Sequence, residues 1–321
     1  MPKVALIFPG QGSQTVGMGK SVYNEMTPEI IERINEKFDI PLLDIMFNGP
    51  IEKLNQTKYT QPAIFIVSVT LLHTLEKFCK EAFWKNVVCV AGHSVGEYSA
   101  LVASGCLQLE SALELVRIRA IAMEEASPKD DQNTSLGSMS AILGCDKKII
   151  EEIIVEHCSS NTKRCTIANY NCPGQIVITG LLDDVETVCS RALECGAKKC
   201  VKLNVSGPFH SQWMETASKR LKEAIEDITF ATCKVPVISN VTAHAMTTAE
   251  DFKRLLPIQV TSPVMWNECM DTMVKMGVDT FVEIGSGKVL SGISKHCATD
   301  KRFISIQTAE DIFLYEHDAF V

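Results

Sequence analysis

Ser94 stands in Gly92-His93-Ser94-Val95-Gly96, a G-x-S-x-G pattern that is typical of a nucleophile at a sharp turn from a strand into a helix. An apolar run at 87–91 precedes the pattern, and a helical stretch at 97–104 follows it. The glycines permit the sharp turn, and the N–H groups at the start of the new helix can bind an anion. The pattern therefore predicts Ser94 as a nucleophile. A surface serine in a glycine-rich turn is the alternative, which the flanking strand and helix disfavour.

A serine nucleophile needs a base, and the chain has 7 histidines to supply one. The side chain of His93 leaves the backbone in a different direction from Ser94, so we expect it to pack and support the turn. His210 lies in a Gly-Pro loop, 205–211, that leads into a helix and can hold a histidine beside the turn. His210 is therefore the preferred base, with His244 as the second candidate. The histidines read as structural are His73, His157 and His317.

Arg119 lies in a predicted helix, 110–126, that is apolar on nearly all sides. Its neighbour Arg117 can pair with Glu114 one turn back, but the neighbours of Arg119 one turn away are apolar. An unpaired guanidinium is costly to bury, so Arg119 should meet a carboxylate. That carboxylate belongs either to the protein, as a buried ion pair, or to a ligand. A transferase for an acidic acyl group would use such a cation, whereas a simple esterase would not.

The elements around these residues alternate between strands and helices. Apolar runs without polar alternation predict strands that are covered on both faces of a parallel sheet. These runs occur at 4–8, 87–91, 235–239 and 280–284. Helical stretches separate them at 61–80, 97–104, 110–126, 211–225 and 264–275. The fold class predicted is α/β, with a hydrolase-like larger domain built on a mostly parallel sheet.

A polar, turn-rich segment at 127–135 opens a different pattern. Residues 134–204 show the order β-α-β-β-α-β, which is ferredoxin-like. We therefore expect an inserted ferredoxin-like α+β subdomain at 134–204. Residues 1–133 and 205–321 would form the larger domain.

Composition narrows the class of protein. The chain has 321 residues, of which 46% are hydrophobic, and a formal net charge of −8. These values exclude a disordered chain and argue against a nucleic-acid partner. The 13 cysteines include no C-x-x-C pair, so neither a zinc knuckle nor a disulfide framework is expected, and the thiols should be reduced.

The sequence also carries expectations about location. No leader pattern is visible at the N-terminus, and no apolar run reaches the ~20 residues needed to cross a bilayer. We therefore expect no membrane partner and a cytoplasmic protein of bacterial type, or one of an organelle matrix if a leader has been removed.

Taken together, these motifs resemble the malonyl-CoA:acyl carrier protein transacylases, the acyltransferases of type II fatty acid synthesis. The resemblance runs from about residue 4 to residue 295. It is carried by ordered motifs: Phe8-Pro9-Gly10-Gln11-Gly12-Ser13-Gln14, Gly92-His93-Ser94-Val95-Gly96-Glu97-Tyr98-Ser99-Ala100-Leu101, Arg119, Asn169-Tyr170-Asn171-Cys172-Pro173-Gly174-Gln175, Gly207-Pro208-Phe209-His210-Ser211 and Glu283-Ile284-Gly285-Ser286-Gly287-Lys288-Val289-Leu290.

The resemblance implies a role for each matching residue. Ser94 would be the nucleophile, His210 the base and Arg119 the ligand of the malonyl carboxylate. The backbone N–H groups of Gln11 and Val95 would form the oxyanion hole.

Two further residues take roles from the same resemblance. The main-chain carbonyl of Gln259 would orient the imidazole of His210. Phe209 matches the form of the histidine loop that is associated with malonyl rather than branched acyl groups.

The implied reaction is a ping-pong transfer from malonyl-CoA to holo acyl carrier protein, by a monomer with no metal or other cofactor. Carrier protein is acidic, so an exposed basic patch is expected near the cleft, from Lys198, Lys199, Lys202 and Lys288. The alternative for these lysines is an ordinary solvated face. The alternative functions are a serine hydrolase or thioesterase that uses water as the acceptor, and a non-catalytic binding module.

Overall fold

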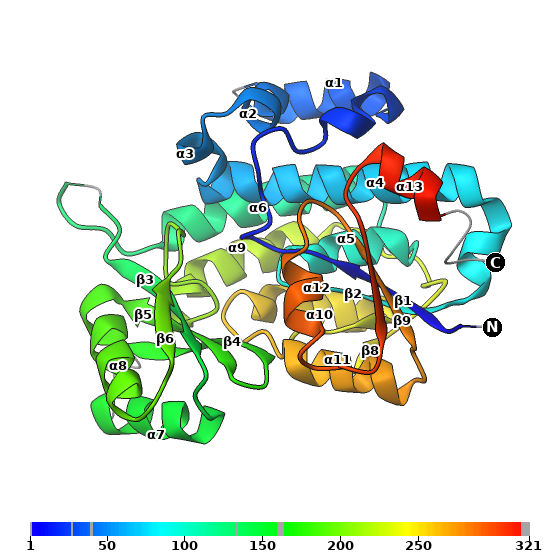
Figure 1. The fold of residues 1–321 in the computed structure, drawn as a ribbon. Helices are drawn as coiled ribbons and strands as arrows, with labels where there is room; N and C mark the ends of the chain where they lie inside the picture. The colour runs from blue at the N-terminus through cyan, green and yellow to red at the C-terminus, as the bar shows by residue number, and fades with distance from the viewer. Residues whose placement is uncertain (1, 27, 39–40, 133, 159–163, 316–321) are drawn as a thin grey trace.

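The computed structural model describes residues 2–26, 28–38, 41–132, 134–158 and 164–315, and their strands form two sheets (Figure 1). His317 lies outside the described residues. The larger sheet has six strands in the order β10-β9-β1-β2-β7-β8. These strands are β1 Val4–Phe8, β2 Val87–Gly92, β7 Val237–Ile238, β8 Ala245–Met246, β9 Thr280–Ile284 and β10 Arg302–Ile306. All neighbours pair in parallel except β7 and β8.

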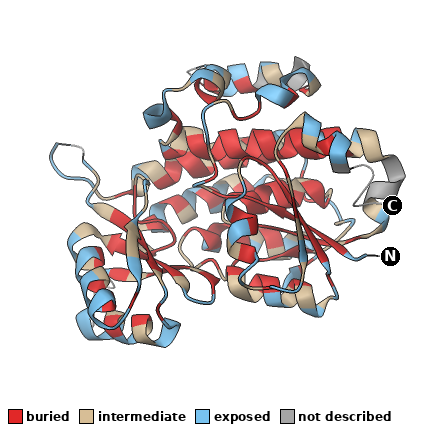
Figure 2. Cartoon of the chain, in the orientation of Figure 1, coloured by how far each residue is buried: buried red, intermediate tan, exposed pale blue. Residues whose placement is uncertain are grey.

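Strand β1 runs through the centre of the larger sheet, with both faces covered. Its residues Val4, Leu6 and Phe8 belong to a core shared with helices α4 and α5, and the alternate residues Ala5 and Ile7 belong to a second core shared with α11. Burial on both faces explains why β1 reads as an unbroken apolar run (Figure 2). The prediction of a mostly parallel sheet is confirmed.

Helices precede, link and cover these strands. In chain order they are α1 Pro28–Lys37, α2 Leu42–Asn48, α3 Ile51–Leu54, α4 Thr57–Lys85, α5 Gly96–Ala103, α6 Leu109–Ala126, α9 Glu215–Glu226, α10 Ala249–Gln259, α11 Trp266–Lys275, α12 Val289–Ser294 and α13 Ala309–Tyr315. Two short 3-10 helices, η1 Lys20–Glu25 and η2 Gln212–Met214, complete this part of the chain.

The second sheet is antiparallel, with four strands in the order β4-β5-β3-β6. Its elements are β3 Gly137–Leu143, α7 Lys147–Cys158, β4 Cys165–Cys172, β5 Gln175–Leu181, α8 Leu182–Glu194 and β6 Lys199–Lys202. This order and pairing are ferredoxin-like, so the predicted ferredoxin-like α+β fold of this part of the chain is confirmed. The sheet and its two helices lie within residues 134–204, where the sequence places an inserted subdomain.

Strand β4 attaches the second sheet to the larger domain. Its Tyr170 N–H donates to the carbonyl of Val264 at 2.9 Å, and the N–H of Val264 donates to the carbonyl of Ala168 at 2.8 Å. These backbone bonds extend the small sheet onto a segment just before α11. Strand β4 is therefore held beside the carboxyl ends of the larger sheet's strands.

Helix α4 corrects one expectation. By length and composition its segment Thr57–Cys79 could cross a bilayer, whereas the sequence analysis expected no such run. However, 72% of its most apolar window is buried inside the protein, and Phe65 and Leu71 belong to the main core. Burial among other helices accounts for its apolar composition.

Candidate active site

Ser94 lies at the turn between β2 and α5, and its φ of 53° is in the left-handed region. Two glycines make this turn possible. A Cβ on Gly92 would lie 1.9 Å from the carbonyl carbon of Gly96, and a Cβ on Gly96 would lie 2.2 Å from the carbonyl oxygen of Phe8. The close approach of β1, β2 and α5 therefore requires both glycines and places Ser94 just beyond the carboxyl end of β2.

The side chain of Asn240, a residue that the sequence does not single out, holds the backbone of this turn by two hydrogen bonds. Its side-chain Nδ2 donates to the carbonyl of Gly92 at 2.7 Å, and its Oδ1 accepts from the N–H of Ser94 at 2.7 Å. Asn240 lies two residues after the end of β7, and a polar residue just beyond the end of a parallel strand is a usable sign of a site residue.

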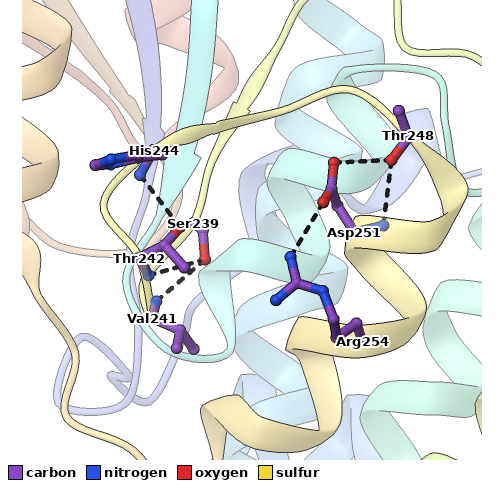
Figure 3. A network of polar contacts seen from close by, with 7 residues as sticks. All are labelled: Ser239, Val241, Thr242, His244, Thr248, Asp251 and Arg254. Carbon is purple, nitrogen blue, oxygen red and sulfur yellow. Dashed lines mark hydrogen bonds and ion pairs between the residues drawn. The ribbon is translucent and has the colours of Figure 1, made fainter.

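The turn that carries Asn240 is itself fixed by hydrogen bonds (Figure 3). The hydroxyl of Ser239 accepts from the N–H groups of Val241 and Thr242 at 3.1 and 3.4 Å. His244, the second candidate base, lies on the same loop but is exposed, and its N–H donates to the hydroxyl of Thr242 at 3.3 Å. The structure therefore places His244 on the surface and Asn240 in the site.

His210 meets Ser94 at hydrogen-bond distance. The hydroxyl Oγ of Ser94 lies 2.8 Å from Nε2 of His210. The other ring nitrogen, Nδ1, lies 2.9 Å from the carbonyl of Gln259 and 3.1 Å from that of Ser262. Since carbonyl oxygens only accept, Nδ1 carries the proton and the Nε2 lone pair faces the serine hydroxyl.

The protonation state of His210 suits a base. Burial, followed by the positive charge of Arg119, lowers the pKa of His210 to about 3, which outweighs the opposing hydrogen bonds from the two carbonyls. The imidazole is therefore neutral at neutral pH and can accept the proton of Ser94. The arrangement is a serine–histidine pair oriented by backbone carbonyls rather than by an acidic side chain.

Arg119 is fully buried in α6 and reaches the same serine. Its Nη2 donates to Oγ of Ser94 at 3.0 Å and to Oε1 of Gln259 at 2.9 Å, and its Nη1 donates to Oε1 of Gln61 at 2.6 Å. Within the described parts of the chain, Arg119 forms no ion pair with a carboxylate. The guanidinium of Arg119 therefore donates to neutral oxygens, those of two side-chain amides and of the Ser94 hydroxyl.

Gln259, at the end of α10, contacts every member of this group. Its main-chain carbonyl accepts from His210, and its side-chain Oε1 accepts from Arg119. Its Nε2 donates to the carbonyl of Ser94 at 3.0 Å and to Oε2 of Glu97 at 2.5 Å. The sequence predicts a role only for the main-chain carbonyl of Gln259, and it does not point to Glu97.

The start of α10 is fixed as firmly as its end. Thr248 caps the helix by accepting from the N–H of Asp251 at 3.2 Å and by donating to that carboxylate at 2.8 Å. Arg254 then donates to the other oxygen of Asp251 at 3.2 Å (Figure 3). Capping at one end holds the helix that presents Gln259 at the other.

Gln11 and Val95 lie on the two loops that approach Ser94. Gln11 follows β1, and its side-chain Nε2 donates to the hydroxyl of Thr57 at 3.4 Å, which in turn lies 2.6 Å from the hydroxyl of Ser206. Val95 is buried at the start of α5. Neither backbone N–H donates to a backbone carbonyl in the turns and loops of the described chain.

A cavity of about 270 Å³ opens over these residues. Ser94, His210 and Gln11 are among its lining residues, and Phe209, itself buried, forms part of its apolar wall with Met139 of the second sheet. The side chain of Gln61 also reaches this cavity. Both domains therefore contribute to one pocket, which is of the size and polarity of a small-ligand site.

His93 packs as expected and links the two domains. Its Nε2 lies 3.0 Å from Oδ1 of Asn171 on β4, and its ring centroid lies 5.6 Å from that of Trp266.

A metal site needs a cluster of ligands. The described residues include no group of three His, Cys, Asp or Glu side chains able to hold an ion. The cysteines whose side chains the structure describes form no disulfide with one another.

Comparison with known proteins gives a consistent family assignment. The acyl transferase domain model matches residues 5–306. The malonyl CoA-acyl carrier protein transacylase of Bacillus subtilis strain 168 is 40% identical over 316 residues, which cover 98% of this chain and 96% of that protein.

Solved structures give the same result. The acyl-carrier-protein-S-malonyltransferase of Bartonella henselae has a TM-score of 0.89 at 38% identity, with 97% of this chain and 98% of that chain covered. A type II PKS acyl-carrier protein in complex with its malonyl-transacylase includes a chain with a TM-score of 0.86 at 32% identity, with coverage of 97% and 98%.

Proposed function

Because the chain belongs to the acyl transferase domain family, and within it to the malonyl CoA-acyl carrier protein transacylases, we propose that it carries a malonyl group from malonyl-CoA to the phosphopantetheine thiol of acyl carrier protein through an ester on Ser94. The contact that carries the proposal is the 3.0 Å hydrogen bond from Nη2 of Arg119 to Oγ of Ser94. It puts a buried cation beside the nucleophile, where an acyl group with a free carboxylate would lie.

In the first half-reaction, Oγ of Ser94 attacks the thioester carbonyl carbon and its proton passes to Nε2 of His210. The new C–O bond creates a tetrahedral oxyanion, which the N–H groups of Gln11 and Val95 stabilise. Collapse of the intermediate breaks the C–S bond, and His210 returns the proton to the CoA thiolate. The malonyl group is then an ester of Ser94.

In the second half-reaction, the thiol of the carrier's phosphopantetheine arm gives its proton to His210 and attacks the ester carbonyl. The C–O bond to Ser94 breaks, and His210 returns the proton to the serine oxygen. The malonyl thioester leaves with the carrier, so the enzyme is regenerated without a cofactor. Each half-reaction uses residues of one chain, so a monomer suffices.

Arg119 selects the acyl group. A malonyl carboxylate is a stronger acceptor than the amide oxygens of Gln61 and Gln259, and its two oxygens match the guanidinium fork. Exchange of a neutral acceptor for the carboxylate would seat the acyl group with its thioester carbon beside Ser94. Phe209 closes the apolar wall of the pocket around it.

The rival function is a serine hydrolase that passes the acyl group to water. The serine–histidine pair alone is compatible with either acceptor. Arg119 favours the transferase, since a hydrolase of simple esters has no use for a buried cation at its nucleophile. The proposed setting is the reducing cytoplasm, or an organelle matrix, in which free cysteines persist.

The direct test of this function is mass spectrometry of the protein after malonyl-CoA is added. We expect a malonyl mass increase on the peptide that contains Ser94, and discharge of that ester by holo carrier protein much faster than by water. Apo carrier protein, which lacks the thiol, is the control and should discharge nothing. Discharge by water at the same rate as by holo carrier would establish the hydrolase instead.

The carrier protein should dock on the lysines named above. Lys198, Lys199, Lys202 and Lys288 are all exposed, and none forms an ion pair with a described carboxylate. Lys202 and Lys288 adjoin Leu203 and Val289, which line the pocket, so they stand close to its entrance. An acidic carrier would be guided to the pocket by these charges.

Replacement of Lys202 and Lys288 by Glu should therefore raise KM for carrier protein several-fold, by about 1 kcal/mol, and leave KM for malonyl-CoA unchanged. The increase should shrink at high salt. Lys222→Glu on the exposed face of α9 is the matched control. Unchanged steady-state parameters in the double variant would mean that these lysines form only a solvated face.

A further inference from the structure

The carboxyl group of Glu97 is buried beside the active site, and the mechanism above gives it no role. Glu97 lies in the first turn of α5 and is 1% exposed. Its Oε2 accepts from Nε2 of Gln259 at 2.5 Å and from the N–H of Asn240 at 3.4 Å. A buried carboxylate with so few partners is costly, so its presence calls for a compensating charge.

Gln259 connects that carboxyl group to Arg119. An amide has one accepting and one donating end, and Glu97 takes the donating end. The accepting end is thereby turned toward Nη2 of Arg119. The reverse orientation would put the amide oxygen against the Glu97 carboxylate and the amide N–H against the guanidinium, which are two repulsive contacts. Glu97 therefore fixes how Gln259 holds the guanidinium.

The other ionisable groups around this relay are neutral. Burial lowers the pKa of His210 to about 3 and raises that of Tyr98, the next residue on α5, to about 12. Burial also raises the pKa of Cys269 on α11 and lowers the pKa of His93 in the turn before α5, so both side chains are uncharged. The remaining polar neighbours, from α4, α10 and the loop after β7, are the amides Gln61, Gln259 and Asn240. Glu97 and Arg119 are thus the only opposite charges in this described cluster.

We propose that Glu97 is the counter-charge of Arg119 when no acyl group is bound, and that it takes up a proton when an acyl carboxylate binds Arg119. The inference rests on the proposed function, in which Arg119 receives that carboxylate. Without a proton, the occupied site would hold two carboxylates and one guanidinium, a net negative charge away from water. A proton from solvent on Glu97 restores neutrality, and the carbonyl oxygen of the protonated group still accepts from Gln259.

The ordinary titration of Glu97 makes this uptake inexpensive. Burial raises the pKa of Glu97 to about 7, against the smaller opposing effects of its hydrogen bonds and of Arg119. In the free site near neutral pH, the ionised form that balances Arg119 and the protonated form are therefore close in free energy. A carboxylate on Arg119 removes the compensating charge and raises this pKa further, so binding and protonation favour each other.

The test is the pH dependence of malonyl-CoA affinity in Ser94→Ala, which cannot be acylated. Because binding favours protonated Glu97, affinity should be constant below about pH 7, fall by up to tenfold for each pH unit above it, and level off once the pH exceeds the pKa of Glu97 in the complex. Acetyl-CoA carries the same nucleotide but no carboxylate, and its affinity should be flat over that range. The ratio of the two dissociation constants therefore isolates the acyl carboxylate.

A second variant identifies the group that titrates. Ser94→Ala with Glu97→Gln keeps an acceptor for Gln259 but cannot change its charge, so the affinity ratio should become independent of pH. Calorimetry in two buffers of different ionisation enthalpy should find net proton uptake on binding near pH 7 in Ser94→Ala and none in the double variant. A flat ratio in Ser94→Ala, or a slope that persists in the double variant, would overturn the proposal.

These outcomes remain separate from those of the proposed function. The pH profile and calorimetry of Ser94→Ala leave Glu97 intact, so they decide the matter even if the double variant does not fold. A malonyl ester on Ser94 of the unsubstituted enzyme together with a flat ratio would contradict only the role of Glu97. Failure to form the ester would instead contradict the transferase function.

Discussion

Arg119→Ala should lower kcat/KM for malonyl transfer by roughly 10² to 10³, while transfer of an acetyl group should change far less. The variant leaves the malonyl carboxylate without its cation in a dry pocket, which costs about 2–5 kcal/mol for a buried, hydrogen-bonded charge pair. Acetyl has no carboxylate and does not use the guanidinium. The measurement is the ratio of malonyl to acetyl transfer at matched carrier concentrations.

The chain offers a matched control on the same helix. Arg117 lies two residues earlier and pairs with Glu114 at 2.7 Å on a partly exposed surface. Such pairs contribute about 0–1 kcal/mol, so Arg117→Ala should leave the malonyl-to-acetyl ratio unchanged. Circular dichroism of Arg119→Ala is needed as well, since its loss removes the charge that balances Glu97. Equal losses for malonyl and acetyl would show that Arg119 serves the fold rather than the acyl group.

Ser94→Ala should abolish transfer, with a fall in kcat of about 10⁴ to 10⁶ and no acylated enzyme in the mass spectrum. The reason is chemical, because no other hydroxyl is held 2.8 Å from the Nε2 of His210 in the described site. Malonyl-CoA should still bind, since Arg119 and the pocket wall are intact. Steady-state transfer and a binding titration check the two halves of this expectation.

Ser190→Ala is the control for that substitution. Ser190 is an exposed serine on α8, whose hydroxyl donates to the carbonyl of Glu186 within its own helix. Its loss should leave transfer within twofold of the unsubstituted enzyme, as is usual for surface positions. Retention of transfer and of a malonyl ester in Ser94→Ala would mean that another residue carries the acyl group.

Strands buried on both faces were the easiest elements to predict from sequence. Strands β1 and β9 begin and end at the predicted residues, because two covered faces leave no polar interruption. Strand β10 escaped prediction, since its edge position leaves Arg302 exposed and Phe303 and Ser305 partly exposed, which interrupts the apolar run. Helix α10 was missed because Pro257 within it resembles a helix end.

Strand β7 is shorter than the sequence predicted. The apolar run begins at Val235, but the paired strand covers only Val237–Ile238. Pro236 has no N–H to donate to a ladder, although its carbonyl accepts from Val90. A hydropathy pattern does not show that Pro236 lacks a backbone N–H, so it predicts a longer strand.

The site was predictable where chemistry restricts residue type, and unpredictable where it depends on three-dimensional approach. The glycines of the turn and the isolated arginine in an apolar helix point to Ser94 and Arg119 from sequence alone. Asn240 carries only the weak signal of a polar residue just after a parallel strand, and Glu97 does not stand out because a glutamate at a helix start is common. Only the folded chain brings them together beside the serine turn, where the N–H of Asn240 donates to Oε2 of Glu97 at 3.4 Å.

Both residues of the proposed catalytic pair have an unusual backbone conformation. Ser94 and His210 have φ values of 53° and 59°, which cost L-residues roughly 1–2 kcal/mol each. Asn240 accepts a hydrogen bond from the backbone N–H of Ser94. The carbonyls of Gln259 and Ser262 accept from Nδ1 of His210 and hold its ring. Attempts to make this enzyme more heat-resistant will therefore find easy gains at the two positions that can least be altered. Thermostability engineering should be directed to the outer helices, because any relaxation at the serine turn or the histidine loop would exchange turnover for robustness.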